Sequence, residues 1–260
     1  MKNQSFTFKE FLNEIYEKPQ KLHEAYFAFH NYSLSNCWLA MCQLGKAEPI
    51  NTFKGWKEIG RNVKKGEKAI KLLMPVNRKF KKKIQENGEE KEQEYSFTQF
   101  IERPFWFGLS QTEGEEIAFD TFPNFNLEKA LNELGIKKEV FQMVNGNCQG
   151  YAYPNLKTIA INPLAFSPFK TSIHEIAHCL LHSEEKKIVD NETLSNGAKE
   201  FEAEATAYLV CCALGKTENL ESSRAYIAGW LNKAEAKESY FKRAFNAANA
   251  VLKAGKENDQ

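Results

Sequence analysis

Residues 174–178 have the sequence His-Glu-Ile-Ala-His, and this pentapeptide constrains the chain more than any other feature. Apolar residues frame it over 173–181, a spacing that predicts an amphipathic helix. Side chains four positions apart share one face of a helix, so His174 and His178 can bind one metal ion. Glu175 lies beside them, where it can accept a proton from an attacking water. The pattern indicates a zinc hydrolase; the alternative is a buried helix whose histidines only form hydrogen bonds.

A catalytic zinc site needs a third protein ligand and one open coordination position. In the extended metzincin pattern the third histidine stands six residues after His178, but Glu184 occupies that position. A second helix, expected at 199–210, is rich in alanine and carries three carboxylates. Because Glu200 and Glu204 share a face of it, we expect Glu200 to be the ligand and Glu204 to hold the ring N–H of a ligand histidine. The alternatives are Glu204 as the ligand, or a solvated glutamate face.

Two further acid–base residues lie near the expected ligands. His182 extends the histidine row by one helical turn. Four protein ligands would close the site to water, so His182 is expected close to the site or at the surface and not on the metal. On the second helix, Glu202 is expected to point away from the face that carries the other two glutamates.

Two short strand patterns precede the motif, at 150–153 and 158–162, joined by a turn at Pro154. In metallopeptidases with such a helix, an edge strand beside it holds an extended peptide by main-chain hydrogen bonds. We expect 158–162 to be that strand, with an ordinary core hairpin as the alternative. The sequence does not identify the group that stabilises an oxyanion; Tyr151 and Tyr153 are candidates.

Composition limits the class of protein. With 42% hydrophobic residues and 20 phenylalanines, the 260-residue chain can form one large core or two smaller ones. The first 30 residues lack an apolar signal core, and no stretch approaches the ~20 apolar residues of a membrane span. The six cysteines include no Cys-x-x-Cys pair and indicate reduced thiols. We therefore expect a cytoplasmic protein without membrane contact.

The formal net charge of +1 conceals a basic segment in the first half of the chain. Residues 54–83 include twelve Lys and Arg but only two acids, whereas 86–94 include five glutamates and one lysine. The segment 79–94 has little apolar content, so it is expected to be an exposed hairpin tip or a flexible loop.

In residues 53–70, ahead of the segment 79–94, aromatic residues are interleaved with cations. Single-stranded nucleic acid is bound in this way, with phosphates on Lys and Arg and bases stacked on aromatic rings. The candidate contacts are Phe53, Trp56, Arg61, Lys64, Lys65 and Lys68. The alternative is that the aromatic side chains belong to the core and the lysines to a solvated surface.

The N-terminal half has an α+β pattern. Helical periodicity runs from 6 to 46 with a break near 31–35, and strand patterns follow at 69–76 and 95–107. This order predicts an N-terminal α+β domain over 1–112.

The C-terminal half is mainly helical. The turn-rich stretch 110–116 is typical of a linker. A helix is expected at 127–134 and a long alanine-rich helix at 222–253, packed behind the two helices that carry the metal ligands. The whole chain is therefore expected to belong to the α+β class, with a C-terminal domain over 113–260 that is mainly helical and contains a small antiparallel sheet.

These features together resemble the ArdC-type antirestriction proteins of plasmids and other mobile elements, with their phage-borne relatives. The resemblance covers nearly the whole chain and rests on five signals that occur in one order. They are the cation-rich segment 53–68, Ser-Gln-Thr-Glu-Gly at 110–114, the hairpin with Tyr151 and Tyr153, the motif at 174–178, and Glu200 with Ala203, Glu204, Ala207 and Tyr208.

The resemblance implies an N-terminal domain that binds single-stranded DNA and a zincin-like metallopeptidase domain related to the regulators ImmA and IrrE. It also implies Zn²⁺ as cofactor and a role in protecting incoming DNA from host restriction. The N-terminal half departs from the family pattern, with a lysine-rich insertion around 79–83 and few matches before residue 31.

Three functions remain open on the sequence alone. The first is an active metallopeptidase with a protein substrate, confined to DNA-bound targets. The second is a DNA-binding shield whose zinc domain is structural. The third is a regulatory module, either a protein-interaction domain or an ImmA-like regulatory protease. The sequence does not predict the oligomeric state.

Overall fold

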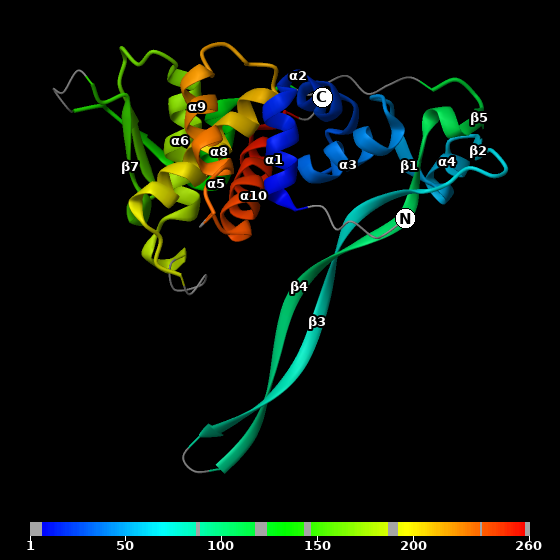
Figure 1. Cartoon of the computed structure of the whole chain (residues 1–260), viewed down its shortest axis with the longest axis horizontal. Coiled ribbons are helices and arrows are strands. Elements are labelled where there is room, and N and C mark those ends of the chain that lie inside the picture. Colours follow the sequence, from blue (N-terminus) through cyan, green and yellow to red (C-terminus); the bar gives the residue numbers. More distant parts are fainter. Residues whose placement is uncertain are drawn as a thin grey trace. The chain divides into compact units, whose positions relative to one another are not determined.

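The computed structural model describes residues 7–86, 89–117, 124–142, 147–186, 192–234 and 236–257, and of these the side chains of 80–98 are left out. The chain divides into two compact units. We call Leu39–Phe119 the ribbon unit, and Met1–Trp38 together with Asp120–Gln260 the helical unit. Figure 1 shows the elements of both, and their mixture confirms the predicted α+β class. Among the residues described, no helix has the length and apolarity needed to cross a bilayer.

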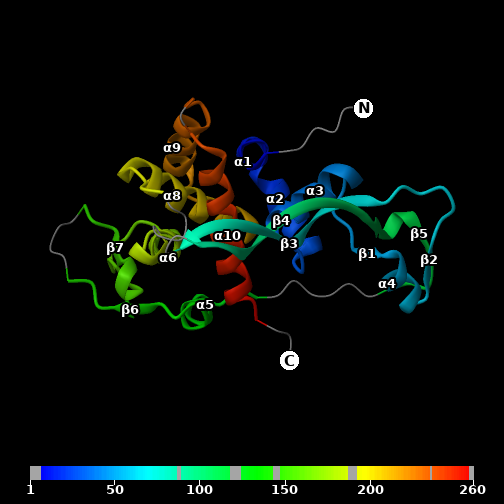
Figure 2. The ribbon, with the colours of Figure 1, turned by 90° about the horizontal axis from the view of Figure 1, so that it is seen from below.

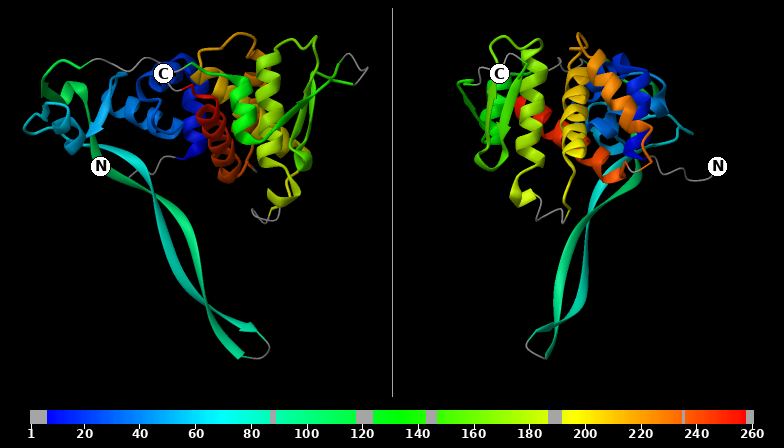
Figure 3. Two further views of the ribbon diagram at one scale, coloured as in Figure 1. Left: turned by 180° about the vertical axis from the view of Figure 1, so that it is seen from behind. Right: turned by 60° about the vertical axis from the view of Figure 1, so that its left-hand side comes forward.

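The helical unit is built on a pair of neighbouring helices. Its elements are α1 (Phe8–Glu17), α2 (Pro19–Phe29), α5 (Leu127–Leu134), β6 (Lys137–Glu139), β7 (Gly150–Tyr153), η2 (Pro154–Leu156), β8 (Thr158–Ile161), α6 (Pro168–Leu181), α8 (Asn196–Ala213), α9 (Glu221–Leu231) and α10 (Glu238–Gly255). Strands β7 and β8 pack against one side of α6, and α8 packs against the other, as Figure 3 shows. Helix α10 contacts α8, α6 and α5.

Local sequence explains why the two central helices begin where they do and why they lie close. Pro168 stands in the first turn of α6, where a missing backbone N–H costs nothing. The side chain of Ser195 caps α8 by accepting a hydrogen bond from the backbone N–H of Ala198. Ala203 and Ala207 on α8 are fully buried, and their small side chains allow neighbouring helices to approach.

The sheet of the helical unit corrects one prediction. Its strand order is β6-β8-β7, with β6 parallel and β7 antiparallel to β8. The sheet is therefore mixed, whereas an antiparallel sheet was expected. Because β8 forms hydrogen bonds on both sides, the expectation that residues 158–162 offer a free edge to a peptide is wrong. The edge strand next to α6 is β7.

The prediction of one long helix at 222–253 is wrong, because this segment forms two helices. Helix α9 ends at Leu231 and α10 begins at Glu238. Asn232 caps the first helix, and the backbone N–H groups of Asn232 and Lys233 bond carbonyls of its last turn.

The ribbon unit contains a long hairpin and a small second sheet. Its elements are the end of α3 (Leu34–Leu44), β1 (Ile50–Thr52), α4 (Phe53–Glu58), β2 (Arg61–Val63), β3 (Ile70–Glu86), β4 (Glu89–Gly108), η1 (Leu109–Gln111) and β5 (Thr112–Gly114). The strand order is β1-β4-β3 in one sheet and β2-β5 in the other. Figure 1 shows β3 and β4 as a two-stranded twisted ribbon, and Figure 2 shows β2 and β5 beside α4.

The hairpin is longer than the sequence predicts. The charged segment 79–94 was expected to be a tip or loop, but it continues both strands as far as Glu86 and Glu89. The register places Lys81 opposite Glu94 and Lys83 opposite Glu92. Residues directly opposite in an antiparallel pair interact, and opposite charges there favour pairing, which explains why a polar segment can form strand.

The stretch 110–116 is part of a fold element, so the predicted linker is wrong there. Strand β5 pairs with β2, and the Arg61 guanidinium donates from Nε to Thr112 Oγ1 at 2.8 Å and from Nη1 to Gly114 O at 3.3 Å. A boundary after residue 112 would cut β5. The compact units instead separate after Phe119, and α1 and α2 belong to the helical unit, where α1 packs on α10 and α2 on α8.

Candidate functional site

The expected metal ligands meet between α6 and α8. The Nε2 atoms of His174 and His178 lie 3.1 Å apart. Glu200 brings Oε2 to 3.4 Å from His174 Nε2 and Oε1 to 3.5 Å from His178 Nε2. One ligand atom from each of the three residues lies within 4.8 Å of the others. The two helices therefore present two imidazoles and a carboxylate to a single point.

These separations fit a divalent cation. In a tetrahedral zinc site with bonds of about 2.0–2.1 Å, donor atoms lie about 3.3 Å from one another. The three distances among His174, His178 and Glu200 span 3.1 to 3.5 Å. Two imidazole nitrogens and one carboxylate are also a donor set found in catalytic zinc sites, and they leave one position open.

Glu204 lies on the other side of the first histidine. Its Oε2 is 2.9 Å from His174 Nδ1, the ring nitrogen that faces away from Glu200. Its Oε1 accepts a hydrogen bond from Lys170 Nζ at 2.9 Å, and that ammonium also donates to Ser223 Oγ at 2.9 Å. Glu204 thus bonds His174 at the nitrogen that faces away from the ligand cluster, and the structure brings Glu200 to the Nε2 side.

Glu175 shares a cavity with the three ligand candidates. The cavity has a volume of about 390 Å³ and is lined by Gly150, Tyr151, Ala152, Pro154, His174, Glu175, His178 and Glu200. Burial raises the pKa of the Glu175 carboxyl, which is 7% exposed, although the nearby histidines lower it. Tyr151 lines this cavity and Tyr153 is not among its lining residues.

Gly150 on β7 sets the width of the cavity beside Glu175. A Cβ on Gly150 would lie 2.8 Å from Thr171 Cγ2 and 3.1 Å from Glu175 Oε1. Real Cβ atoms essentially never come within 3.0 Å of another atom, so an alanine here would force the Thr171 methyl to move. The Glu175 carboxylate would also have to shift by a few tenths of an ångström. Glycine is the residue that lets β7 pass this close to the carboxylate.

The electrostatics of the cluster are dominated by His174. Burial lowers the pKa of His174, but hydrogen bonds to Glu200 and Glu204 outweigh it and raise the pKa to about 9. Hydrogen bonds from His174 and His178 hold the pKa of Glu200 far below its usual value. Burial raises the pKa of Glu204, yet hydrogen bonds from His174 and Lys170 bring it down to about 2. Without a metal, the cluster is a protonated imidazole between two carboxylates.

The sequence did not predict that Glu202 would take part. It was expected to point away from the other glutamates, and it does so, but its Oε2 reaches His182 Nε2 at 3.1 Å, and its Oε1 reaches Arg243 on α10. The Lys170 contact was also missed. The sequence feature that could have indicated these contacts is the row of glutamates at alternate positions on an alanine-rich helix. A carboxylate buried on such a helix needs a partner.

The six nucleic-acid candidates lie in the ribbon unit, and the structure separates them into two groups. Trp56 is 1% exposed and its Nε1 donates to Phe107 O at 2.8 Å, so the prediction that it stacks on bases is wrong and it is a core residue. Arg61 is engaged in its bonds to β5. Phe53 is 57% exposed, and the lysines of the group are exposed as well. The exposed lysines are Lys64, Lys65 and Lys68.

Comparison with known proteins points to one family. Residues 13–103 match the family described as the N-terminal domain of the anti-restriction factor ArdC. This span begins in α1 and ends in β4, so it crosses from the helical unit into the ribbon unit.

Relatives and solved structures extend the comparison beyond that domain. An uncharacterized protein of Bacillus anthracis is 30% identical over 93% of this chain and 49% of its own length, so the chain spans about half of that relative. The metal-free crystal structure of the antirestriction protein ArdC from plasmid R388 has a TM-score of 0.54, with 19% identity over 95% of this chain and 94% of that one. A Mn(II)-bound structure of the same protein has a TM-score of 0.48, with 18% identity over 95% and 97%. This chain therefore has the fold of ArdC and contains, over residues 13–103, a domain of the ArdC N-terminal family.

Proposed function

We propose that this chain is a zinc-dependent metallopeptidase whose N-terminal part binds single-stranded DNA, and that it serves an antirestriction role of the ArdC type. The observation that carries the proposal is the cluster of His174, His178 and Glu200, with Glu175 in the same cavity. A bound Zn²⁺ would supply Lewis acidity, bringing the pKa of water to about 7 and polarising a carbonyl.

Glu175 is the proposed general base. It accepts the proton of the attacking water and later transfers it to the leaving amine, so it must be able to hold a proton between the two steps. Burial raises the pKa of this carboxyl, which favours that intermediate protonation. Glu204 holds the Nδ1–H of His174 and so keeps Nε2 directed at the cavity.

Strand β7 is the proposed binding site for the peptide backbone of a substrate. It is an edge strand of its sheet, and Gly150, Tyr151 and Ala152 line the cavity of the candidate metal site. An edge strand offers backbone N–H and C=O groups to an extended peptide, which would lie antiparallel or parallel to β7 across the cavity. This assignment replaces the strand expected from the sequence.

The test of the peptidase proposal is cleavage of a synthetic peptide library by zinc-loaded protein, with and without a single-stranded oligonucleotide, and with product termini identified by mass spectrometry. We expect cleavage by the wild type and its loss in Glu175→Gln, which keeps the metal ligands. Zinc content of both proteins is the control. Equal cleavage by the variant would reject Glu175 as the base, whereas no cleavage by the wild type under either condition would leave a zinc-stabilised DNA-binding shield as the function.

The proposed DNA contacts are the exposed members of the original set: Phe53, Lys64, Lys65 and Lys68. The ArdC-type domain match and the exposure of these side chains support the proposal. Lys64 Nζ donates to Ser110 O at 2.9 Å, which holds the start of this segment in place. Lysine ammonium groups bind phosphates, and an exposed phenyl ring can stack on a base.

Fluorescence anisotropy with a labelled single-stranded oligonucleotide at several salt concentrations tests these contacts. Reversing Lys65 and Lys68 to glutamate should weaken binding and reduce the slope of log K against log salt by about 1.4, since each phosphate contact on a single strand contributes about 0.7. Lys137→Glu, an exposed lysine of β6 in the helical unit, is the matched control. An unchanged slope would reject these two contacts.

A further inference from the structure

His178, the second histidine of the proposed metal site, differs from His174 in the hydrogen-bond partner of Nδ1, the ring nitrogen that does not face Glu200. Its Nδ1 lies 2.9 Å from Nδ1 of His182, and Nε2 of His182 lies 3.1 Å from Glu202 Oε2. Glu202 Oε1 accepts a hydrogen bond from Arg243 Nε at 2.9 Å, and Arg243 Nη2 lies 2.7 Å from the same oxygen. A continuous polar chain therefore connects the metal-facing histidine to α10.

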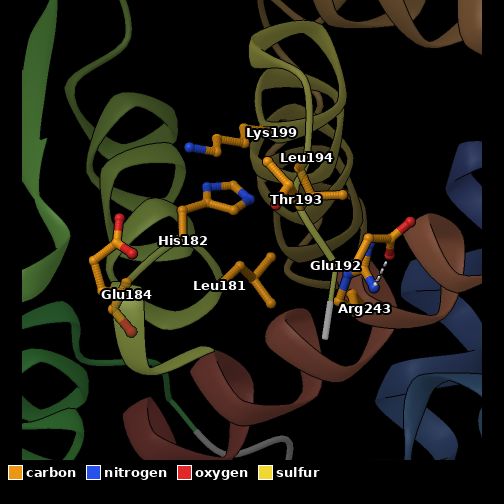
Figure 4. A pocket seen from close by; sticks show the side chains of 9 residues that line it. Leu181, His182, Glu184, Glu192, Thr193, Leu194, Lys199 and Arg243 are labelled. Carbon is orange, nitrogen blue, oxygen red and sulfur yellow. Dashed lines mark hydrogen bonds and ion pairs between the residues drawn. The ribbon is translucent and has the colours of Figure 1, made fainter. Parts of the chain in front are cut away.

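This chain is built into the interior of the helical unit. The side chain of His182 is 2% exposed and that of Glu202 is fully buried. Arg243 is anchored in turn by an ion pair from Nη1 to Glu192 Oε2 at 3.0 Å. Figure 4 shows His182 at the end of α6 with its ring directed toward α8, and the ion pair of Glu192 with Arg243. Buried polar groups in such a network are costly unless every one is satisfied, so each geometry is constrained by the next.

The hydrogen-bond roles along the chain follow from chemistry. When Nε2 of His178 faces a cation, its proton must be on Nδ1, so Nδ1 of His182 must be the acceptor. The remaining proton of a neutral His182 is then on Nε2, where Glu202 accepts it. A carboxylate can only accept and the Arg243 guanidinium can only donate, so only one distribution of protons is compatible with the contacts along the chain. Arg243 donates from Nε, while its buried Nη2 contributes an ion pair to Glu202 without a hydrogen bond of good geometry.

The two histidines of the site are thus held in different ways. His174 donates directly to a carboxylate, Glu204, which is backed by the Lys170 ammonium. His178 donates to a neutral imidazole that connects it to the second carboxylate, Glu202. Both carboxylates come from α8, and each is neutralised by a cation from another helix.

We propose that His182, Glu202 and Arg243 are positioning residues, which fix the tautomer and ring orientation of His178 with Nε2 toward the metal. This inference rests on the proposed metal site. A purely structural tie between α6, α8 and α10 would also use these contacts, but it would not affect metal affinity once the protein is folded.

The test compares two substitutions of His182 that differ in whether the new side chain can accept a hydrogen bond from His178 Nδ1. In His182→Asn, the side-chain oxygen can take the place of Nδ1 and accept the proton of His178; in His182→Phe, no acceptor remains. Zn²⁺ affinity is measured by chelator competition on metal-free protein shown to be folded by circular dichroism. We expect the Phe variant to bind Zn²⁺ about 10–100-fold more weakly than the wild type, and the Asn variant to recover most of that loss.

A matched control separates positioning from stability. Thr206 on α8 is buried, and its hydroxyl lies within hydrogen-bond distance of Glu202 O and of Ala244 O on α10. Thr206→Val therefore weakens the packing of α8 on α10 without changing the side chains of His182, Glu202 or Arg243. It should lower the free energy of unfolding and leave Zn²⁺ affinity unchanged. Equal Zn²⁺ affinity in the wild type and His182→Phe would overturn the proposal, provided that Glu200→Ala still abolishes binding. Undiminished binding by Glu200→Ala would instead show that the metal site itself is wrong.

If His182→Phe does not fold, the wild type decides the question. Long-range ¹H–¹⁵N spectra of the zinc-loaded protein report which ring nitrogen of each histidine carries the proton. We expect His178 protonated at Nδ1 and His182 protonated at Nε2. A proton on Nδ1 of His182 would overturn the proposal, because that nitrogen could then not accept from His178.

Discussion

Zinc binding to the cluster should weaken as the pH falls from 9 to 7. In the metal-free protein, burial lowers the pKa of His174, but hydrogen bonds to Glu200 and Glu204 raise it to about 9. A cation that binds Nε2 must displace that proton, because a metal ligand must be the neutral imidazole. Through His174 alone, the apparent Kd should therefore rise about tenfold for each pH unit below 9, which is about 2.7 kcal/mol over two units. Ionisation of a zinc-bound water with a pKa of about 7 would add to this dependence and continue it above pH 9.

Two measurements check this prediction. Isothermal titration calorimetry at pH 7 in two buffers of different ionisation enthalpy should show release of at least about one proton on zinc binding, one from His174 and a further fraction from a zinc-bound water. Chelator competition between pH 7 and 9.5, corrected for protonation of the chelator, should give the slope. In Glu204→Gln the histidine loses a charged acceptor, so its pKa falls and the contribution of His174 to the pH dependence should end at a lower pH. A Kd that is constant from pH 7 to 9, with no proton released, would show that no proton on His174 competes with zinc.

Two further predictions concern residues outside the ligand set. Gly150→Ala should reduce peptide cleavage about 10–100-fold, because the new methyl group shifts Glu175. The control is Gly229→Ala on α9, where a Cβ meets no atom within 4 Å. This control should leave cleavage unchanged and raise the free energy of unfolding by about 0.5–1 kcal/mol. Equal rates for both variants would contradict the first. Trp56→Ala should lower the free energy of unfolding by about 3–5 kcal/mol, because Trp56 is buried. Phe53 is exposed, so Phe53→Ala should lower the free energy of unfolding by less than about 0.5 kcal/mol and should instead weaken oligonucleotide binding. Chemical denaturation and anisotropy measure the two effects, and a destabilised Phe53→Ala would show that this ring is structural.

The sequence predicts that His174, His178 and Glu200 come together, because much of the information for that arrangement is local. The spacing of His174 and His178 on one helix determines that their imidazoles meet, whatever else the fold does. Glu200 and Glu204 share a face of α8, so the sequence alone left both open as the third ligand. The choice between them depends on the axial offset between α6 and α8, a tertiary quantity that residue spacing does not contain.

Predictions failed where the outcome depended on contacts distant in sequence. Trp56 follows an exposed phenylalanine in a cation-rich segment, and only its bond to Phe107 reveals it as core. The charged hairpin was expected to be a tip or loop because its composition is polar, whereas the strand register, which depends on the partner strand, places Lys81 opposite Glu94. The segment 158–162 was expected to be an edge strand, but β6 pairs in parallel with β8 and covers that edge, a contact that the sequence does not reveal.

The most direct test of the account is the zinc stoichiometry and affinity of the purified chain beside Glu200→Ala and Glu204→Ala. We predict one tightly bound Zn²⁺ in the wild type and loss of binding when Glu200 is removed. Measured at pH 9.5, where few His174 side chains are protonated, removal of Glu204 should weaken the site about 10–100-fold, since its contact with His174 Nδ1 only orients a ligand. Wild-type affinity in Glu200→Ala would contradict the account, because the carboxylate that faces both imidazoles would then have no part in holding the metal.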